Sequence, residues 1–167
     1  MQPKPLSLSE CPCARAVETV GEWWSILILR DASLQGLTRF DEFERSLGIA
    51  PNMLARRLKQ LTASGLFERR RYQDRPPRHD YVLTQKGRDF FPVVAALAAF
   101  GNRHLAPEGE SLVLVERGSA RPLAPLLVDA ETLRPITAET VTVAAGPQAS
   151  EAMRRRLDAL ADQGSRT

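Results

Sequence analysis

The middle of this chain constrains its fold most, because two short helical patterns are followed there by a pair of strand patterns. Apolar residues at helical spacing predict helices over 38–47 and 52–64, with a tight glycine- and proline-containing connection between them. Strands are expected over 66–72 and 80–83, on either side of a loop rich in arginine and proline. Helix, turn, helix and basic hairpin are the parts of a winged helix-turn-helix. The sequence therefore predicts an α+β, mostly α, protein that contains this domain.

The second helical pattern has two faces. Leu54, Leu58 and Leu61 fall at i, i+4 and i+7 and are expected to face the core. The opposite face and its flanks carry side chains of the kind that pair with base edges in the major groove. The DNA contacts predicted from this helix are Asn52, Met53, Arg56, Arg57, Lys59 and Gln60. On an isolated helix this face would simply be solvated, but its place before a basic hairpin favours contact with bases.

Further DNA contacts are predicted on either side of this helix. Arg39 lies at the start of the preceding helical pattern. The hairpin loop is stiffened by prolines, so Arg75, Arg78 and His79 should project at a tip and meet phosphates or enter the minor groove. The net charge is only +3, but residues 50–79 carry eight Lys/Arg against two Asp/Glu. Such a local excess is typical of a surface that binds a polyanion, although charge alone would fit a solvated basic face equally well.

A long helix is expected after the hairpin, from Thr84 to about His104, with Pro92 bending it. Its apolar residues cover so wide an arc that burial on two sides, and hence a homodimer, is predicted. A ligand pocket lined by the same residues is the alternative. The predicted dimer residues are Phe90, Phe91, Val94, Leu97 and Phe100.

Two more helices are predicted before the helix-turn-helix pattern, over 10–20 and 22–32. The second is strongly apolar and should be the central element of the core. Trp23 and Trp24 cannot both face inward, so one is expected in the core and the other at an edge or a subunit contact. With the long helix, these elements form a predicted domain over residues 1–106.

The texture of the sequence changes after Pro107. Short runs rich in Val, Leu and Thr, separated by Gly, Pro and Asp-Ala-Glu-Thr breaks, predict a small strand-rich appendage over 107–145. The expected strands are Leu112–Glu116, Leu126–Val128 and Thr140–Ala144. Residues 146–167 are expected to be a flexible tail, in which Met153, Leu157 and Leu160 hint at a short amphipathic helix.

Cys11 is the one candidate for a reactive side chain. It stands just before the helix that begins at Pro12, where the positive end of the helix dipole and Arg15 would lower the pKa of the thiol. We hypothesise that oxidation or alkylation of Cys11 alters the geometry of the dimer and releases DNA. A small buried side chain without this role explains the residue equally well. Cys13 is too close for an unstrained bridge to Cys11, so an intersubunit disulfide is the favoured alternative.

Other kinds of function find little support in the sequence. Cys11-Pro12-Cys13 is not a zinc spacing, and His79 and His104 are far from it, so no metal is expected. No catalytic pair of nucleophile and base, and no glycine loop for a phosphate, can be placed, so neither an enzyme nor a cofactor is predicted. The longest apolar run, Val93–Phe100, is too short for a membrane span, and no signal-peptide pattern begins the chain. A reducing cytoplasm suits the two cysteines.

About ninety residues, Cys11 to Leu105, resemble the HxlR-type winged-helix transcriptional regulators. No single piece is specific, but the ordered set is. The residues that carry the resemblance are Cys11-Pro12, Gly21, Trp24, Ile28-Leu29-Arg30, Arg39-Phe40-Asp41-Glu42, Ile49, Pro51, Leu54, Arg57-Leu58, Leu61, Gly65-Leu66, Glu68-Arg69, Pro76-Pro77-Arg78, Tyr81, Leu83-Thr84, Lys86-Gly87 and Pro92. Two positions depart from the pattern: Trp23 stands where lysine is usual, and Ala50 where serine is usual.

The resemblance implies homodimers, formed by the first and last helices of the domain, that bind inverted-repeat operators. It also implies that the cysteine matching Cys11 is a redox or electrophile sensor in some members. The sequence therefore predicts a sequence-specific regulator, a repressor, whose partners are palindromic double-stranded DNA and a second copy of the chain. Its switch would be Cys11 chemistry or a small ligand. The alternative is a winged-helix interaction module whose basic surface docks an acidic protein or a membrane.

Overall fold

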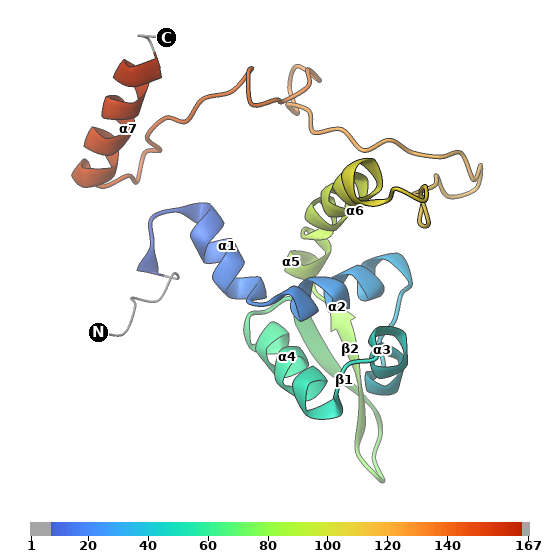
Figure 1. The fold of residues 1–167 in the computed structure, drawn as a ribbon. Helices are drawn as coiled ribbons and strands as arrows, with labels where there is room; N and C mark the ends of the chain where they lie inside the picture. The colour runs from blue at the N-terminus through green and yellow to red at the C-terminus, as the bar shows by residue number, and fades with distance from the viewer. Residues whose placement is uncertain (1–7, 165–167) are drawn as a thin grey trace. The chain divides into compact units, whose positions relative to one another are not determined.

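The structure is a computed structural model that describes residues 8–164. In chain order its elements are α1 (Pro12–Val20), α2 (Trp23–Leu34), α3 (Phe40–Leu47), α4 (Pro51–Ala63), β1 (Phe67–Gln73), β2 (Arg78–Leu83), α5 (Gln85–Arg88), α6 (Phe91–Leu105) and α7 (Glu151–Gly164). Two compact units are formed, one of Ala16–Pro125 and one that combines the described residues before and after it. The larger unit, mostly helical with a two-stranded sheet, confirms the predicted winged helix-turn-helix (Figure 1).

The core of the larger unit is built around α2. Ile28 and Leu29 of α2 are fully buried, and they share one hydrophobic cluster with Phe43 of α3, with the three leucines predicted to face inward from α4, and with Phe67 of β1. Phe43 and Phe67 pack edge to face, with ring centroids 6.3 Å apart. This cluster fixes α3, α4 and the hairpin relative to one another, which is the arrangement that a DNA-reading helix needs.

Backbone signals in the sequence set the ends of α3 and α4. Gly48 ends α3 in the left-handed conformation, with φ of 60°, and Pro51 occupies the first turn of α4, where its missing N–H costs nothing. Gly65 follows α4 with φ of 72°, and the next N–H, of Leu66, donates to the carbonyl of Leu61 at 2.9 Å. The helix predicted over 52–64 is therefore confirmed to within one residue at each end.

Helix α2 contains the tryptophan pair and a buried acid. Trp24 packs against the core, whereas Trp23 is 58% exposed and stacks on Trp24 with ring centroids 3.8 Å apart, so the predicted division of the two rings is confirmed. Asp31 is fully buried, and its carboxylate accepts hydrogen bonds from Ser46 Oγ at 2.7 Å and from Gln35 Nε2 at 3.0 Å. Because Ser46 belongs to α3, this acid links α2 to α3.

The single long helix predicted from Thr84 is wrong. Thr84 does cap a helix, accepting from the N–H of Gly87 at 3.1 Å, but α5 ends at Arg88 and α6 begins at Phe91. Pro92 explains the break, because its ring has no N–H to give to the carbonyl of Arg88 and would collide with it in a continuous helix. Pro92 therefore starts a new helix and does not bend an existing one.

The predicted strand-rich appendage contains turns in place of strands. Among residues 106–150, all of which the structure describes, backbone pairing is limited to two isolated bridges, Val115–Pro122 and Val128–Pro135. Extended pieces between the turns are too short to build a ladder. A helix, α7, forms over part of the segment expected to be a flexible tail, with Met153 and Leu157 half-buried. No helix within residues 8–164 is long and apolar enough to cross a bilayer.

Candidate nucleic-acid interface

The outward face of α4 is exposed and held on a rigid support. Asn52, Arg56 and Lys59 are exposed, as predicted, while Leu54 and Leu58 on the opposite side are fully buried. Met53 is half-buried against the core, and its sulfur lies 3.1 Å from a guanidinium nitrogen of Arg56. The helix can therefore present an amide, a guanidinium and an ammonium group to a groove without moving.

Arg57 does not lie on this face. Its side chain is only 5% exposed, and its guanidinium forms an ion pair with Glu22, the residue just before α2. A second nitrogen, Nη1, donates to Gln60 at 3.0 Å, whereas Nε is buried with no acceptor among the described residues. The expectation that Arg57 flanks the DNA-facing side is wrong, because Arg57 lies at the edge of the buried leucine row and its guanidinium is paired with Glu22. Arg57 anchors α4 to the start of α2.

Gln60 has a mixed environment. It is half-buried, accepts the hydrogen bond from Arg57, and lies against the turn between α1 and α2. At that turn a Cβ on Gly21 would come within 2.8 Å of the Gln60 amide nitrogen, and Gly21 has φ of 71°. Only glycine fits there without displacing Gln60. The amide is thus at the boundary of the outward face, not at its centre.

The hairpin forms the wing. β1 and β2 pair antiparallel, with Phe67 opposite Leu83 and Arg71 opposite His79, and the tip extends beyond α3 and α4 in Figure 1. Strand β2 is two residues longer than predicted and β1 is moved by one residue along the chain, so the loop is reduced to residues 74–77, next to a bulge in β1. Arg75 and Arg78 are exposed at this tip, as predicted.

His79 is not at the tip. It lies within β2, half-buried, and one of its ring nitrogens is 3.0 Å from Arg69 of β1. The predicted DNA contacts did not include Arg69, Arg70 and Arg71, which are all exposed on β1. The triple-arginine run was a usable signal, because a two-stranded ribbon leaves both faces of its outer half open to solvent.

Arg39 lies at the base of the wing. Its backbone forms a bridge with Asp80 of β2, its side chain is 3.7 Å from the Asp80 carboxylate, and its guanidinium lies 4.9 Å from the centre of the Tyr72 ring. The N–H groups of Arg39 and Thr38 donate to Glu42 at 2.9 and 3.0 Å, and these two bonds lower the pKa of Glu42. Arg39 is exposed, so it remains available to a phosphate beside the wing.

The basic side chains of this surface differ in how far their charge is already neutralised. Arg70 pairs with Glu68, and Arg71 pairs with Asp74 at 3.0 Å. Within the part of the chain that is described, no ion pair involves the four exposed cations of the outward face and the tip, Arg56, Lys59, Arg75 and Arg78. Those four are the charges most available to an external anion.

The predicted dimer residues divide between two sides of α6. Val94 is only 3% exposed and faces α2 within the same chain, and Phe90 is half-buried against the core, so neither is free for a partner. Phe91, Leu97 and Phe100 are 40%, 47% and 57% exposed. Apolar residues therefore cover a wide arc of this helix, but those on one side of it already pack against the rest of the same chain.

Cys11 lies in the smaller unit, immediately before α1, and is exposed. Hydrogen bonds from the backbone N–H of Ala14 and then of Cys13 lower the pKa of its thiol, and the positive charge of Arg156 contributes. The start of the helix therefore lowers the pKa of the Cys11 thiol, as predicted, and the cation that contributes is Arg156, whereas the predicted cation was Arg15. Cys11 also lines an open cavity of about 670 Å³ with Val143, Met153 and other residues of the same unit. No group of three or more metal-ligating side chains occurs in residues 8–164.

The sequence of this chain matches a known family over the elements that form this surface. The model of the HxlR-like helix-turn-helix family matches residues 19–109, from the end of α1 to just beyond α6, which is more than half of the chain. The chain belongs to the HxlR-like helix-turn-helix family. An uncharacterized HTH-type transcriptional regulator of Mycobacterium tuberculosis is 40% identical over 134 residues, which cover 80% of this chain and 84% of the relative.

Two solved structures extend the comparison. A candidate transcription factor of Pseudomonas aeruginosa, PA1374, is 57% identical, with a TM-score of 0.63 over 88% of this chain and 100% of that one. The redox regulator HypR in its reduced form is 30% identical, with a TM-score of 0.52 over 59% of this chain and 99% of that one. This HxlR-like protein is thus a transcriptional regulator with a DNA-binding helix-turn-helix domain, and its family is not one of enzymes.

Proposed function

We propose that this HxlR-like regulator acts as a homodimeric repressor that binds inverted-repeat operators, with α4 in successive major grooves and the wing along the flanking backbone. The observation that carries this proposal is the exposed face of α4, where Asn52 and Arg56 are held by a fully buried leucine row. Arginine pairs with guanine and asparagine with adenine in the major groove, so these two side chains would supply base discrimination. Arg75, Arg78 and Arg39 would supply sequence-independent contacts to phosphates.

The exposed apolar residues of α6 support the homodimer. Val93, Leu97 and Phe100 are each 45% exposed or more and repeat at helical spacing. Burying such a face against a second copy removes it from water, and a two-fold symmetric dimer would place two recognition helices side by side. A dimer of this kind reads half-sites about one helical turn of DNA apart.

Cys11 would switch the regulator. Its lowered pKa favours the nucleophilic thiolate, and its place at the start of α1 would connect oxidation or alkylation to the dimer. The similarity to HypR, which is a redox regulator, supports this switch. The cavity beside Cys11 would equally admit a small electrophile to the thiol.

Selection of bound duplexes from a random DNA library, with the full-length protein under reducing conditions, tests the DNA-binding proposal. We expect an inverted repeat with half-sites about 10 base pairs apart, bound with an affinity that falls steeply with salt. Enrichment of a single unrepeated motif would exclude the dimeric mode of binding. No enriched motif, together with salt-sensitive binding to acidic protein surfaces, would favour the alternative of a winged-helix interaction module. Transcript levels in a deletion strain then distinguish repression from activation: the transcripts of genes beside the selected sites should increase.

Repeating the binding measurement after oxidant treatment tests the switch. The parent should lose the operator, Cys11→Ser should keep it, and Cys13→Ser is the matched control for a thiol two residues away. Alkylation of Cys11 should reach half of its maximal rate below the pH of about 8.5 that is typical of a free cysteine. A Cys11→Ser protein that still releases DNA on oxidation would remove Cys11 from the mechanism.

A further inference from the structure

Residues 114–123 and 127–136 are two copies of one ten-residue turn. The first reads LVERGSARPL and the second LVDAETLRPI. Leucine, valine, arginine and proline are identical at four positions, and three more positions exchange Glu for Asp, Ser for Thr and Leu for Ile. The first copy belongs to the larger compact unit and the second to the smaller one.

The backbone geometry of the two copies is the same. Glu116 donates its N–H to the carbonyl of Arg121 at 2.9 Å, and Asp129, its match, donates to Arg134 at 2.9 Å. Each copy closes with a bridge between valine and proline, and each holds a non-glycine residue, Ala120 or Leu133, at φ of 56°. A left-handed residue at the same place in both copies is a costly feature, so its repetition marks one folding unit used twice.

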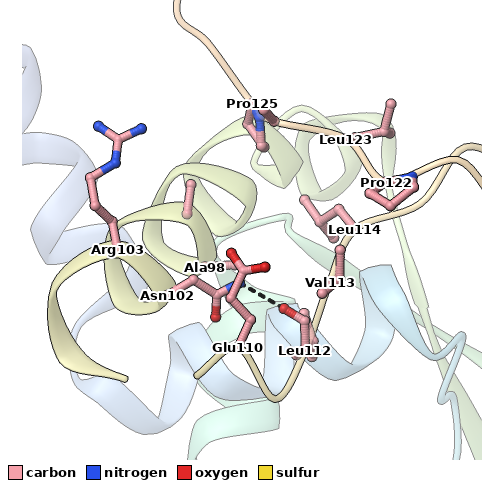
Figure 2. Close-up of a pocket in the computed structure, with 12 residues that line it drawn as sticks. Ala98, Asn102, Arg103, Glu110, Leu112, Val113, Leu114, Pro122, Leu123 and Pro125 are labelled. Atoms are coloured by element: carbon pink, nitrogen blue, oxygen red, sulfur yellow. Dashed lines mark hydrogen bonds between the residues drawn. The ribbon is translucent and has the colours of Figure 1, made fainter. Parts of the chain in front are cut away.

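The first copy lies on α6. Asn102 of α6 donates to the carbonyl of Leu112, just before the turn, at 2.8 Å (Figure 2). The apolar residues on either side of the turn line a cavity of about 400 Å³ together with Ala98 and Asn102. This arrangement shows what kind of surface the turn fits: an apolar helix face with small residues.

The second copy carries apolar residues in the same register, and two of them, Leu126 and Leu127, are more exposed than their matches in the first copy. Leu126 and Leu127 are each 66% exposed and Val128 is 38% exposed. Of their matches beside the first copy, Val113 is 43% exposed and Leu114 is half-buried, whereas Val115 is 49% exposed. The second copy is therefore the more exposed of the two at Leu126 and Leu127, but not at Val128. An extended segment with consecutive exposed Leu, Leu and Val is unusual on a surface that meets only water.

A second face of α6 offers a surface for it. At 100° per residue, Val93, Leu97 and Phe100 lie on the side of α6 opposite Ala98 and Asn102, and all three are exposed. The link between the two copies is short compared with the path around a helix. Three residues link the copies, which span at most about 14 Å when extended. Half the circumference of a helix with side chains, about 10–12 Å across, is about 16–19 Å.

We propose that the second turn packs on the Val93–Leu97–Phe100 face of α6 in a second copy of the chain, so that the two arms of a dimer are exchanged. This inference rests on the proposed homodimer and names a segment that would stabilise it. The first turn covers one side of α6 within the chain, and the second turn of the partner covers the other side. The repeat thus exists because the same helix is bound twice, once within a chain and once between chains.

Cross-linking between differently tagged chains tests this arrangement. Both chains carry Cys11→Ser and Cys13→Ser; one adds Arg134→Cys in the second turn, and the other adds His104→Cys, one helical turn beyond Phe100. After the two proteins are mixed and exchange subunits, a short bismaleimide should link them into a heterodimer. Arg121→Cys, at the matching position of the first turn, is the control, and it should link to His104→Cys of another chain at least tenfold less. Circular dichroism checks that each variant is folded.

Each result decides the question. A tenfold preference for the second turn, with light scattering showing a dimer, supports the exchanged arms. A dimer in which both turns link equally, or neither links, overturns the exchange and leaves the homodimer intact. Monomers at every concentration overturn both the exchange and the homodimer on which it rests.

Discussion

The two faces of α4 carry basic side chains of the same chemistry in opposite surroundings. Arg57 on the inner edge is 4% exposed and is paired with Glu22, whereas Arg56, its neighbour, is exposed and pairs with no acid in the described residues. The first holds the helix in place and the second is left for a ligand. The excess of positive charge counted over residues 50–79 is therefore larger than the charge available to DNA, because Arg57 is buried and already neutralised by Glu22.

Of the substitutions that test this contrast, Arg57→Ala should have the largest effect, and that effect should be on the stability of the fold. Arg57→Ala deletes a buried ion-paired side chain and leaves a void beside Gln60, so we expect a loss of about 3 kcal/mol in the free energy of unfolding. Glu22 is 52% exposed and can be solvated, which keeps the loss at the lower end of the range for broken buried pairs. Urea denaturation measures it.

Arg57→Met is the matched control, because methionine keeps most of the volume and removes the buried charge. It should cost less than about 1 kcal/mol, since apolar replacements of buried ions are often neutral. An Arg57→Ala protein with parental stability and reduced operator affinity would place Arg57 on the DNA side of the helix.

Removing Arg56 should leave stability unchanged and reduce discrimination. If Arg56 pairs with a guanine, Arg56→Ala should lower the ratio of operator affinity to scrambled-DNA affinity by about 2 kcal/mol, or roughly thirtyfold. Competition binding with the two duplexes measures this ratio. Lys59→Ala, an exposed cation on the same helix, is the control and should weaken binding to both duplexes alike. Discrimination retained by Arg56→Ala would move base reading to other residues of α4.

The same contrast explains what the sequence could and could not predict. The α3–α4 pair and the hairpin depend on local signals, such as Gly48, Pro51 and Gly65, and these formed where expected. Helical spacing places Arg57 at the edge of the leucine row and Arg56 on the opposite face, but the partner of Arg57, Glu22, is 35 positions away in the chain and no pattern within α4 indicates it. Tertiary partners decide the residues at the edge of a helix face.

Errors beyond residue 84 have a different cause. The sequence predicted one helix from Thr84 to about His104 with two buried sides, but the helix is interrupted between Arg88 and Phe91, and Val94 is buried within the chain. In the appendage, Val- and Leu-rich runs predicted strands. A strand needs a neighbouring strand to pair with, and here each extended piece enters a turn after a single bridge. Periodicity identified which residues were apolar there, but not what they would meet.

The smallest predicted effect concerns the wing, where the contrast between paired and unpaired arginines recurs. Arg78 at the tip forms no ion pair with a described residue, whereas Arg70 on β1 is paired with Glu68. Arg78→Ala should weaken binding to every duplex by a similar factor and reduce the slope of log affinity against log salt by about 0.9, the change for one phosphate contact. Arg70→Ala should change the slope less, because Glu68 already neutralises that guanidinium. Fluorescence anisotropy across a salt series measures both slopes, and equal changes for the two variants would mean that Glu68 releases Arg70 when DNA binds.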